Sequence, residues 1–149
     1  MEHQSDSTGF LTDVGEVFEN IGGADTLREL TDYFYDKVME DPILKEMFEF
    51  AHEKLNSSLE EGKRRQFLFL QQRFGGPRDY ESLRGHPMLR KRHVYFKIGF
   101  KERDAWFNLM MESLDHVGIT KDHPARPVIE QYLGKTATHM INHQRSPLL

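Results

Sequence analysis

The sequence predicts an all-α protein of one domain, and three observations support this class. The chain has 149 residues, a length that fits a single domain. Its apolar residues recur three or four positions apart, as on one face of a helix, and no segment alternates convincingly with period two. Glycine and proline separate these helical patterns. We therefore expect helices packed around one shared core.

The first two helical pieces precede Asp41-Pro42. One lies at residues 14–21 and ends at Gly22-Gly23, a common stop signal. The next is predicted to begin after a cap at Asp25 and to end at Asp41-Pro42, because the residue before a proline avoids helical geometry. Its apolar face consists of Leu27, Leu30, Phe34 and Val38.

The middle of the chain is predicted to hold a short helical piece, a loop and a longer helix. Residues 43–48 form the short apolar piece, and residues 49–58 form the loop. The longer helix follows, and Gly75-Gly76-Pro77 ends it. One face of this helix carries Leu59, Gly62, Gln66, Phe69 and Leu70.

The last part of the chain contains two long helical patterns after an irregular stretch. Residues 78–87 are predicted to be irregular, and a short piece with Leu89 and His93 follows. A break at residues 96–99 precedes a long helix with Trp106, Leu109, Met110, Leu114 and Val117 on one face. The final helix carries Val128, Ile129, Tyr132, Leu133, Thr136 and Met140.

The prediction thus comprises two short and four longer helical pieces in one domain, residues 14–143. A flexible N-terminal extension, residues 1–13, is expected before this domain, and a C-terminal tail, residues 144–149, after it.

Composition excludes several kinds of site and partner. The chain has no cysteine, so disulfides, zinc–thiolate sites and iron–sulfur clusters are excluded, and a cytoplasmic location is expected. A formal net charge of −4 argues against nucleic acid as a partner. No apolar run approaches the roughly 20 residues that span a bilayer, so no membrane association is expected. The short basic runs at 63–65 and 90–92 are interpreted as solvated helix faces.

Four residues are candidates for chemistry, although each also has an ordinary structural explanation. A lone histidine such as His93 is more often a surface or core residue than a metal ligand. Gln66 lies on an apolar face, where its amide must bond either to a packing neighbour or to a ligand. Tyr35 and Trp106 bring an O–H and an N–H donor into the predicted core. Periodicity alone predicts a small helical domain without an assigned function.

Five motifs follow one another in a characteristic order. They are Ile21-Gly22-Gly23, Phe34-Tyr35 with Asp41-Pro42 downstream, Phe74-Gly75-Gly76-Pro77, the run Gly85-His86-Pro87-Met88-Leu89-Arg90-Lys91-Arg92-His93, and Glu102-Arg103-Asp104-Ala105-Trp106. In this order and spacing the chain resembles the truncated haemoglobins, most closely the second of the family's three groups, from about Phe18 to about Asn142. The resemblance implies a two-over-two helical sandwich around one haem b (iron protoporphyrin IX).

The resemblance also implies roles for individual residues. His93 matches the proximal histidine that binds the iron. The distal positions that contact a bound ligand are matched by Tyr35, Gln66 and Trp106. Arg65 and Arg92 match basic positions that pair with the haem propionates. Apolar positions that line the pocket are matched by Phe48, Phe69, Leu89 and Phe96.

Two features depart from the common family pattern. Gly62 occupies the position where many globins carry a distal histidine, so we expect no gating by that side chain and open ligand access. The 49–58 segment looks longer than usual. His52, within it, is interpreted as a loop histidine, with the alternative that a flexible loop brings it to the iron as a sixth ligand.

These roles imply a haem protein that binds dioxygen, carbon monoxide or nitric oxide at a five-coordinate iron. Donors on the distal side predict tight, slowly released dioxygen. Nitric oxide oxidation or peroxide-dependent oxidation would need an unknown reductase or an oxidant, so enzymatic activity stays open. Two other interpretations are a cofactor-free helical interaction module and a haem-based gas sensor. The protein is expected to be a monomer or a homodimer.

Overall fold

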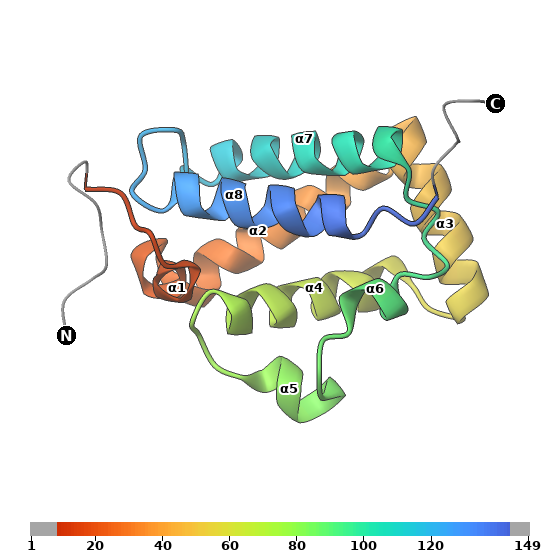
Figure 1. Cartoon of the computed structure of the whole chain (residues 1–149), viewed down its shortest axis with the longest axis horizontal. Coiled ribbons are helices and arrows are strands. Elements are labelled where there is room, and N and C mark those ends of the chain that lie inside the picture. The colour runs from red at the N-terminus through yellow and green to blue at the C-terminus, as the bar shows by residue number, and fades with distance from the viewer. Residues whose placement is uncertain (1–8, 144–149) are drawn as a thin grey trace.

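Helices make up most of the computed structural model, which describes residues 9–143 (Figure 1). Residues 1–8 and 144–149, parts of the predicted extension and tail, lie outside the described residues. In chain order, the elements are the 3-10 turn η1 (Val14–Glu16), α1 (Val17–Asn20), α2 (Gly23–Val38), α3 (Pro42–Leu55), α4 (Leu59–Arg73), α5 (Asp79–Arg84), α6 (Leu89–Arg92), α7 (Phe100–His116) and α8 (Arg126–His139). Across the described residues, no helix is long and apolar enough to cross a membrane.

Two pairs of helices form the body of the molecule. Helix α2 packs against α4, and α7 packs against α8, while further contacts between α2 and α7 join the two pairs. Figure 1 shows α7 and α8 along one side, α4 along the opposite side, and α3 at one end of the molecule. This arrangement confirms the all-α, two-over-two fold class that the sequence predicts.

The core lies where the two pairs meet. The predicted face of α2 is buried at all four positions, including Phe34, and it packs with Leu44 of α3, Met110 of α7 and Ile129 of α8. Burying a side chain of this size contributes roughly 1.5–3 kcal/mol. The core therefore fixes the relative positions of the helices that carry the candidate site.

Side-chain caps position the starts of α3 and α4. Asp41 Oδ1 accepts hydrogen bonds from the backbone N–H groups of Ile43 (2.9 Å) and Leu44 (3.1 Å), and Ser58 caps α4 in the same way. The predicted cap of α2 at Asp25 is wrong. Helix α2 begins at Gly23, after Gly22 turns the chain with a φ of 104°, so that Asp25 lies within the first turn.

Two segments predicted to be irregular are helical. Helix α3 continues to Leu55, so the predicted loop at 49–58 is wrong over most of its length. Its buried face runs on through Ala51 and His52, and the helix ends at Asn56, where φ is 50°. Helix α5 lies within the predicted irregular stretch 78–87 and buries Tyr80. The described residues therefore contain five long helices instead of the expected four.

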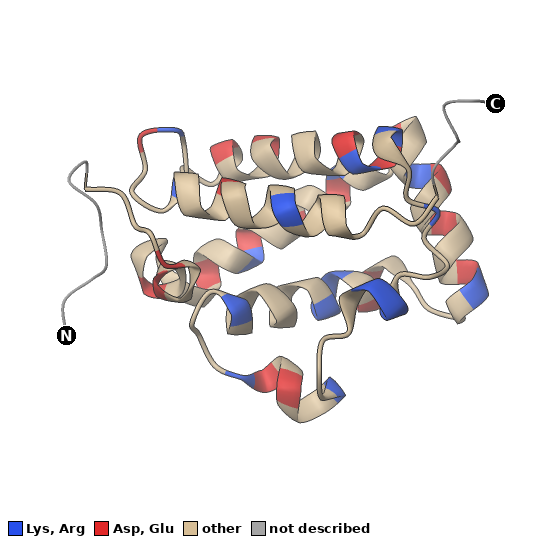
Figure 2. Cartoon of the chain, viewed as in Figure 1, with Lys and Arg blue, Asp and Glu red and all other residues tan. Residues whose placement is uncertain are grey.

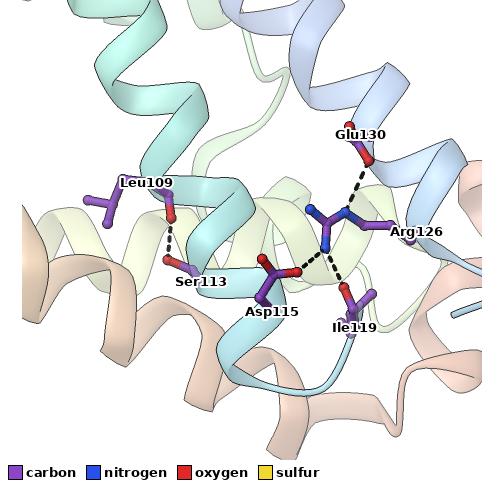
Figure 3. A network of polar contacts seen from close by, with 6 residues as sticks. All are labelled: Leu109, Ser113, Asp115, Ile119, Arg126 and Glu130. Carbon is purple, nitrogen blue, oxygen red and sulfur yellow. Dashed lines mark hydrogen bonds and ion pairs between the residues drawn. The ribbon is translucent and has the colours of Figure 1, made fainter. Parts of the chain in front are cut away.

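Arg126 joins the start of α8 to the loop after α7 (Figure 3). Its side chain is only 3% exposed, and its Nη1 donates to Asp115 Oδ1 (2.6 Å) and to the Ile119 carbonyl (2.7 Å). Its Nε donates to Glu130 Oε2 (3.1 Å). Because both carboxylates remain partly exposed, the network satisfies the buried guanidinium without burying two further charges.

The N-terminal segment packs against two loops. Leu11 is 5% exposed, and its N–H donates to the Pro124 carbonyl (2.9 Å). At the end of α4, the Phe74 carbonyl accepts from the Phe18 N–H (2.8 Å). The following residue, Gly75, has a φ of 97° and lies directly against the carbonyl of Gly15.

Candidate cofactor site

A cavity of about 520 Å³ lies between the helix pairs and receives side chains from α2, α3, α4, α5, α6, α7 and α8. All of the site residues that the sequence singled out line this cavity: Tyr35, Phe48, Arg65, Gln66, Phe69, Leu89, Arg92, His93, Phe96 and Trp106. The fold thus brings together residues from widely separated parts of the chain.

His93 lies at the end of α6, where the backbone fixes its ring. The ring Nδ1 is 2.6 Å from the Leu89 carbonyl oxygen, which requires a proton on Nδ1 and leaves Nε2 as the nitrogen able to bind a metal. Burial lowers the pKa of His93 below its ordinary value of 6.5, although the bond to Leu89 acts in the opposite direction. The imidazole is therefore neutral at neutral pH, as metal binding requires.

Asn142 supports the turn that follows His93, and sequence reasoning did not identify it. Its Nδ2 donates to the carbonyls of His93 (3.2 Å) and Phe96 (3.0 Å), while its Oδ1 accepts from the Ile98 N–H (3.0 Å). These three bonds set the path of the chain between α6 and α7. A tertiary contact of this kind leaves no local pattern in the sequence.

The opposite wall of the cavity carries three potential hydrogen-bond donors. Tyr35 comes from α2, Gln66 from α4 and Trp106 from α7. Burial raises the pKa of Tyr35, so its phenol keeps the proton. Gln66 Oε1 is buried and has no hydrogen-bond partner among the described residues.

His52 also lines the cavity, and its interpretation as a loop histidine is wrong. It lies on α3, one turn after Phe48, and its side chain is 7% exposed. The spacing of four residues from Phe48 was the available signal. The space beside Gly62 is occupied, because a methyl group added there would lie 3.0 Å from His52 Cε1 and 3.3 Å from the Tyr35 hydroxyl. Open ligand access at this position stays a prediction.

Aromatic rings form much of the cavity wall. The Phe96 ring packs edge-on against Phe48, with centroids 5.3 Å apart, and it also contacts the His93 ring at 5.0 Å. Phe69 packs edge-on against Tyr80 of α5, at 5.5 Å. The short helix that the sequence did not predict thus supports this wall.

Guanidinium groups line the same cavity. Arg65 donates to Ser57 Oγ (2.8 Å), and Arg92 donates to the carbonyls of Pro87 and Arg84 (2.8 Å each). Arg84 itself is a third cation on the cavity wall that the sequence analysis missed, and burial together with the nearby Arg92 lowers its pKa. Figure 2 shows that α6 and the neighbouring part of α4 carry positively charged residues and that the end of α5 does so too.

This set of residues fits a haem. Apolar and aromatic side chains suit the porphyrin, one neutral imidazole leaves Nε2 for the iron, and guanidinium groups suit two carboxylates. The buried oxygen of Gln66 and both buried ring nitrogens of His52 lack partners among the described residues. Buried polar groups without partners are rare in native structures, so these atoms favour a site that holds a polar ligand.

Comparisons with known proteins agree with this geometry. Residues 16–142 match the family described as bacterial-like globin. The chain is 40% identical over 120 residues to the group 2 truncated hemoglobin YjbI of Bacillus subtilis, covering 80% of this chain and 84% of that protein.

Solved structures give the same result. The fold is similar to a hemoglobin of Chloroflexus aurantiacus, with a TM-score of 0.76, 44% identity, and coverage of 86% of this chain and 98% of that one. It is also similar to a truncated, oxygen-avid haemoglobin of Bacillus subtilis, with a TM-score of 0.73, 39% identity, and coverage of 85% and 99%.

Proposed function

This chain belongs to the bacterial-like globin family, with relatives among the group 2 truncated haemoglobins, and on that basis we propose that it binds dioxygen on a haem b held by His93. When bound, the haem supplies a ferrous iron that takes diatomic ligands. The observation that carries the proposal is the His93 ring, which faces the cavity with Nδ1 occupied by the Leu89 carbonyl at 2.6 Å.

The proximal residues keep the imidazole in one orientation. The Leu89 carbonyl sets the tautomer of His93, and Asn142 holds the carbonyl of His93 itself. Hydrogen bonds that hold a metal-binding imidazole from its far side orient the ring and increase its basicity. We propose that a haem held by His93 would be five-coordinate at rest and that Tyr35, Gln66 and Trp106 would be available to a ligand bound there.

The distal residues supply hydrogen-bond donors to the ligand. Dioxygen takes up negative charge when it binds, whereas carbon monoxide stays nearly neutral, so donors favour dioxygen. The phenol of Tyr35 keeps its proton and is therefore a competent donor. A hydrogen bond to a charged group contributes about 1.5–3 kcal/mol, which corresponds to a roughly ten- to hundred-fold slower release.

Cations hold the carboxylates of the cofactor. We propose that Arg65 and Arg92 pair with the propionates, joined by Arg84, which lines the same cavity. Arg92 also donates to two backbone carbonyls, so its role is partly to hold the segment before α6.

Slow release of dioxygen favours scavenging or redox chemistry over oxygen delivery. Nitric oxide oxidation and peroxide-dependent oxidation are the candidate reactions, the first with an external reductase as partner. A relative described as oxygen-avid is consistent with this view. Membership of a haem-binding family favours the haem over the cofactor-free interpretation.

Reconstitution with haem tests the proposal. The protein should take up one haem, and the reduced form should bind dioxygen and carbon monoxide with the corresponding shifts of the Soret band. Tyr35→Phe should release dioxygen roughly ten- to hundred-fold faster. Tyr33→Phe is the matched control, because Tyr33 lies on the same helix but bonds to Glu112 outside the cavity (2.7 Å). Absence of haem uptake, or equal release rates for both variants, contradicts the proposal.

A further inference from the structure

We infer that His52 acts as a distal histidine, donating a hydrogen bond to the small ligand from the side of the cavity where Gly62 lacks a side chain. The inference rests on the proposed function, because it concerns the ligand that a haem would hold. No hydrogen bond among the described residues involves this imidazole.

The ring of His52 is buried without polar partners. The side chain is 7% exposed, and neither Nδ1 nor Nε2 has a hydrogen-bond partner among the described residues. The rings of Phe48 and Phe96 pack against it, with centroids 6.0 and 5.8 Å away. A buried polar group left unpaired is costly and rare in native structures, so a residue of this kind in a cavity wall indicates a ligand-contacting role.

The glycine at position 62 provides the space for this ring. A methyl group added at Gly62 would lie 3.0 Å from His52 Cε1, 3.2 Å from His52 Nε2 and 3.3 Å from the hydroxyl of Tyr35. The imidazole and the phenol therefore converge on one point of the cavity wall. Any larger residue at position 62 would push both groups away from it.

The imidazole is in the right charge state for hydrogen bonding. Burial lowers the pKa of His52, the charge of Arg65 acts in the same direction, and Glu61 opposes them. A neutral imidazole carries one donor and one acceptor nitrogen. His52 can thus donate to a ligand with one of its two ring nitrogens.

The position of His52 favours donation over coordination of the metal. Its carbonyl accepts from the Ser57 N–H (2.9 Å) in the helix end, and its ring packs against two phenylalanines. Axial coordination was expected to depend on a flexible loop, whereas His52 lies on the helix α3, which continues to Leu55.

Substitution of His52 in the haem-reconstituted protein tests the inference. His52→Leu should release dioxygen roughly ten- to hundred-fold faster than the parent and should raise the C–O stretching frequency of the carbon monoxide complex. His52→Gln keeps a donor, so its rate and frequency should stay closer to the parent. His139→Leu is the control, because His139 is exposed at the end of α8 and does not line the cavity.

Gly62→Ala provides a second route that leaves His52 in place. It should change the release rate in the same direction as His52→Leu. Its effect should be smaller when added to His52→Leu, where only the contact with the Tyr35 hydroxyl remains to be disturbed. This variant keeps the inference testable if the leucine variant folds poorly.

Two outcomes overturn the inference. The first is a parent-like release rate and C–O frequency in His52→Leu or, failing its folding, in Gly62→Ala. The second is a six-coordinate, low-spin ferrous spectrum in the parent that disappears in His52→Leu or His52→Gln, because the imidazole then binds the iron itself. Failure of the parent to take up haem instead refutes the proposed function, and this inference with it.

Discussion

Gly75→Ala is expected to destabilise the protein strongly, because position 75 lies against the backbone of the turn η1. Gly75 follows α4 with a φ of 97°, and the carbonyl of Gly15 lies directly against its Cα. An added methyl group would overlap the carbonyl oxygen and lie 2.8 Å from the carbonyl carbon. The neighbour is backbone, so no side-chain rotation relieves the overlap.

Two separate costs contribute to the expected effect. Holding alanine in the left-handed region costs about 1–2 kcal/mol. Overpacking in a filled site costs about 1–3 kcal/mol, and the upper part of this range applies because a backbone segment has to move. The sum is about 3–5 kcal/mol, a large share of the roughly 5–15 kcal/mol that stabilises a native protein.

Gly118→Ala isolates the first cost, that of holding alanine in the left-handed region. Gly118 has a φ of 87°, and an added methyl group there would meet no atom within 4 Å. Equilibrium unfolding in guanidinium chloride, followed by circular dichroism, should give a loss of about 1–2 kcal/mol for Gly118→Ala and a clearly larger loss for Gly75→Ala. Equal losses in the two variants would refute the proposed contact between α4 and the first turn.

Two further variants test other parts of the account. Arg126→Met should lower the free energy of unfolding by about 1–3 kcal/mol, because the Ile119 carbonyl loses its donor while both carboxylates remain partly exposed; no loss in a denaturant titration would contradict this. His123 accepts from the Ala125 N–H through Nδ1 (3.0 Å), and burial lowers its pKa below 6.5. The contribution of this group to stability is therefore complete above about pH 6.5 and is lost as the pH falls toward the folded-state pKa. The free energy of unfolding should fall less between about pH 7 and about pH 5.5 in His123→Gln than in the parent, and identical pH dependences would rule this out.

The fold class follows from the strong helical periodicity of the sequence, and most of the site follows from the order of the family motifs along the chain. The face Leu27–Val38 is fully buried at its predicted positions because a 3.6-residue period leaves few alternatives over about three turns. The residues assigned by the family resemblance converge on one cavity because the order of the helices fixes which faces meet.

Short and polar helical segments could not be predicted in the same way. Helix α5 has six residues, too few for a stable isolated helix, and it depends on Tyr80 packing against Phe69. The end of α3 carries glutamate, lysine and histidine, which look like a solvated loop in a linear sequence. Only the packing of Ala51 and His52 against the rest of the molecule identifies this turn as helical.

The same limitation explains why His52 was assigned to a loop. Its burial depends on the space at Gly62, a residue on another helix, and no local pattern links positions 52 and 62. Asn142 and Arg84 were missed for a similar reason, since their contacts join segments that are distant or irregular in the sequence.

Resonance Raman spectroscopy of the reduced, haem-loaded protein tests the central claim most directly, because it detects the bond between iron and a histidine. The parent should show an iron–histidine stretching band, His93→Gly should lose it, and added imidazole should restore it by occupying the space of the missing ring. An unchanged band in His93→Gly without imidazole would contradict the assignment of His93 as the proximal ligand.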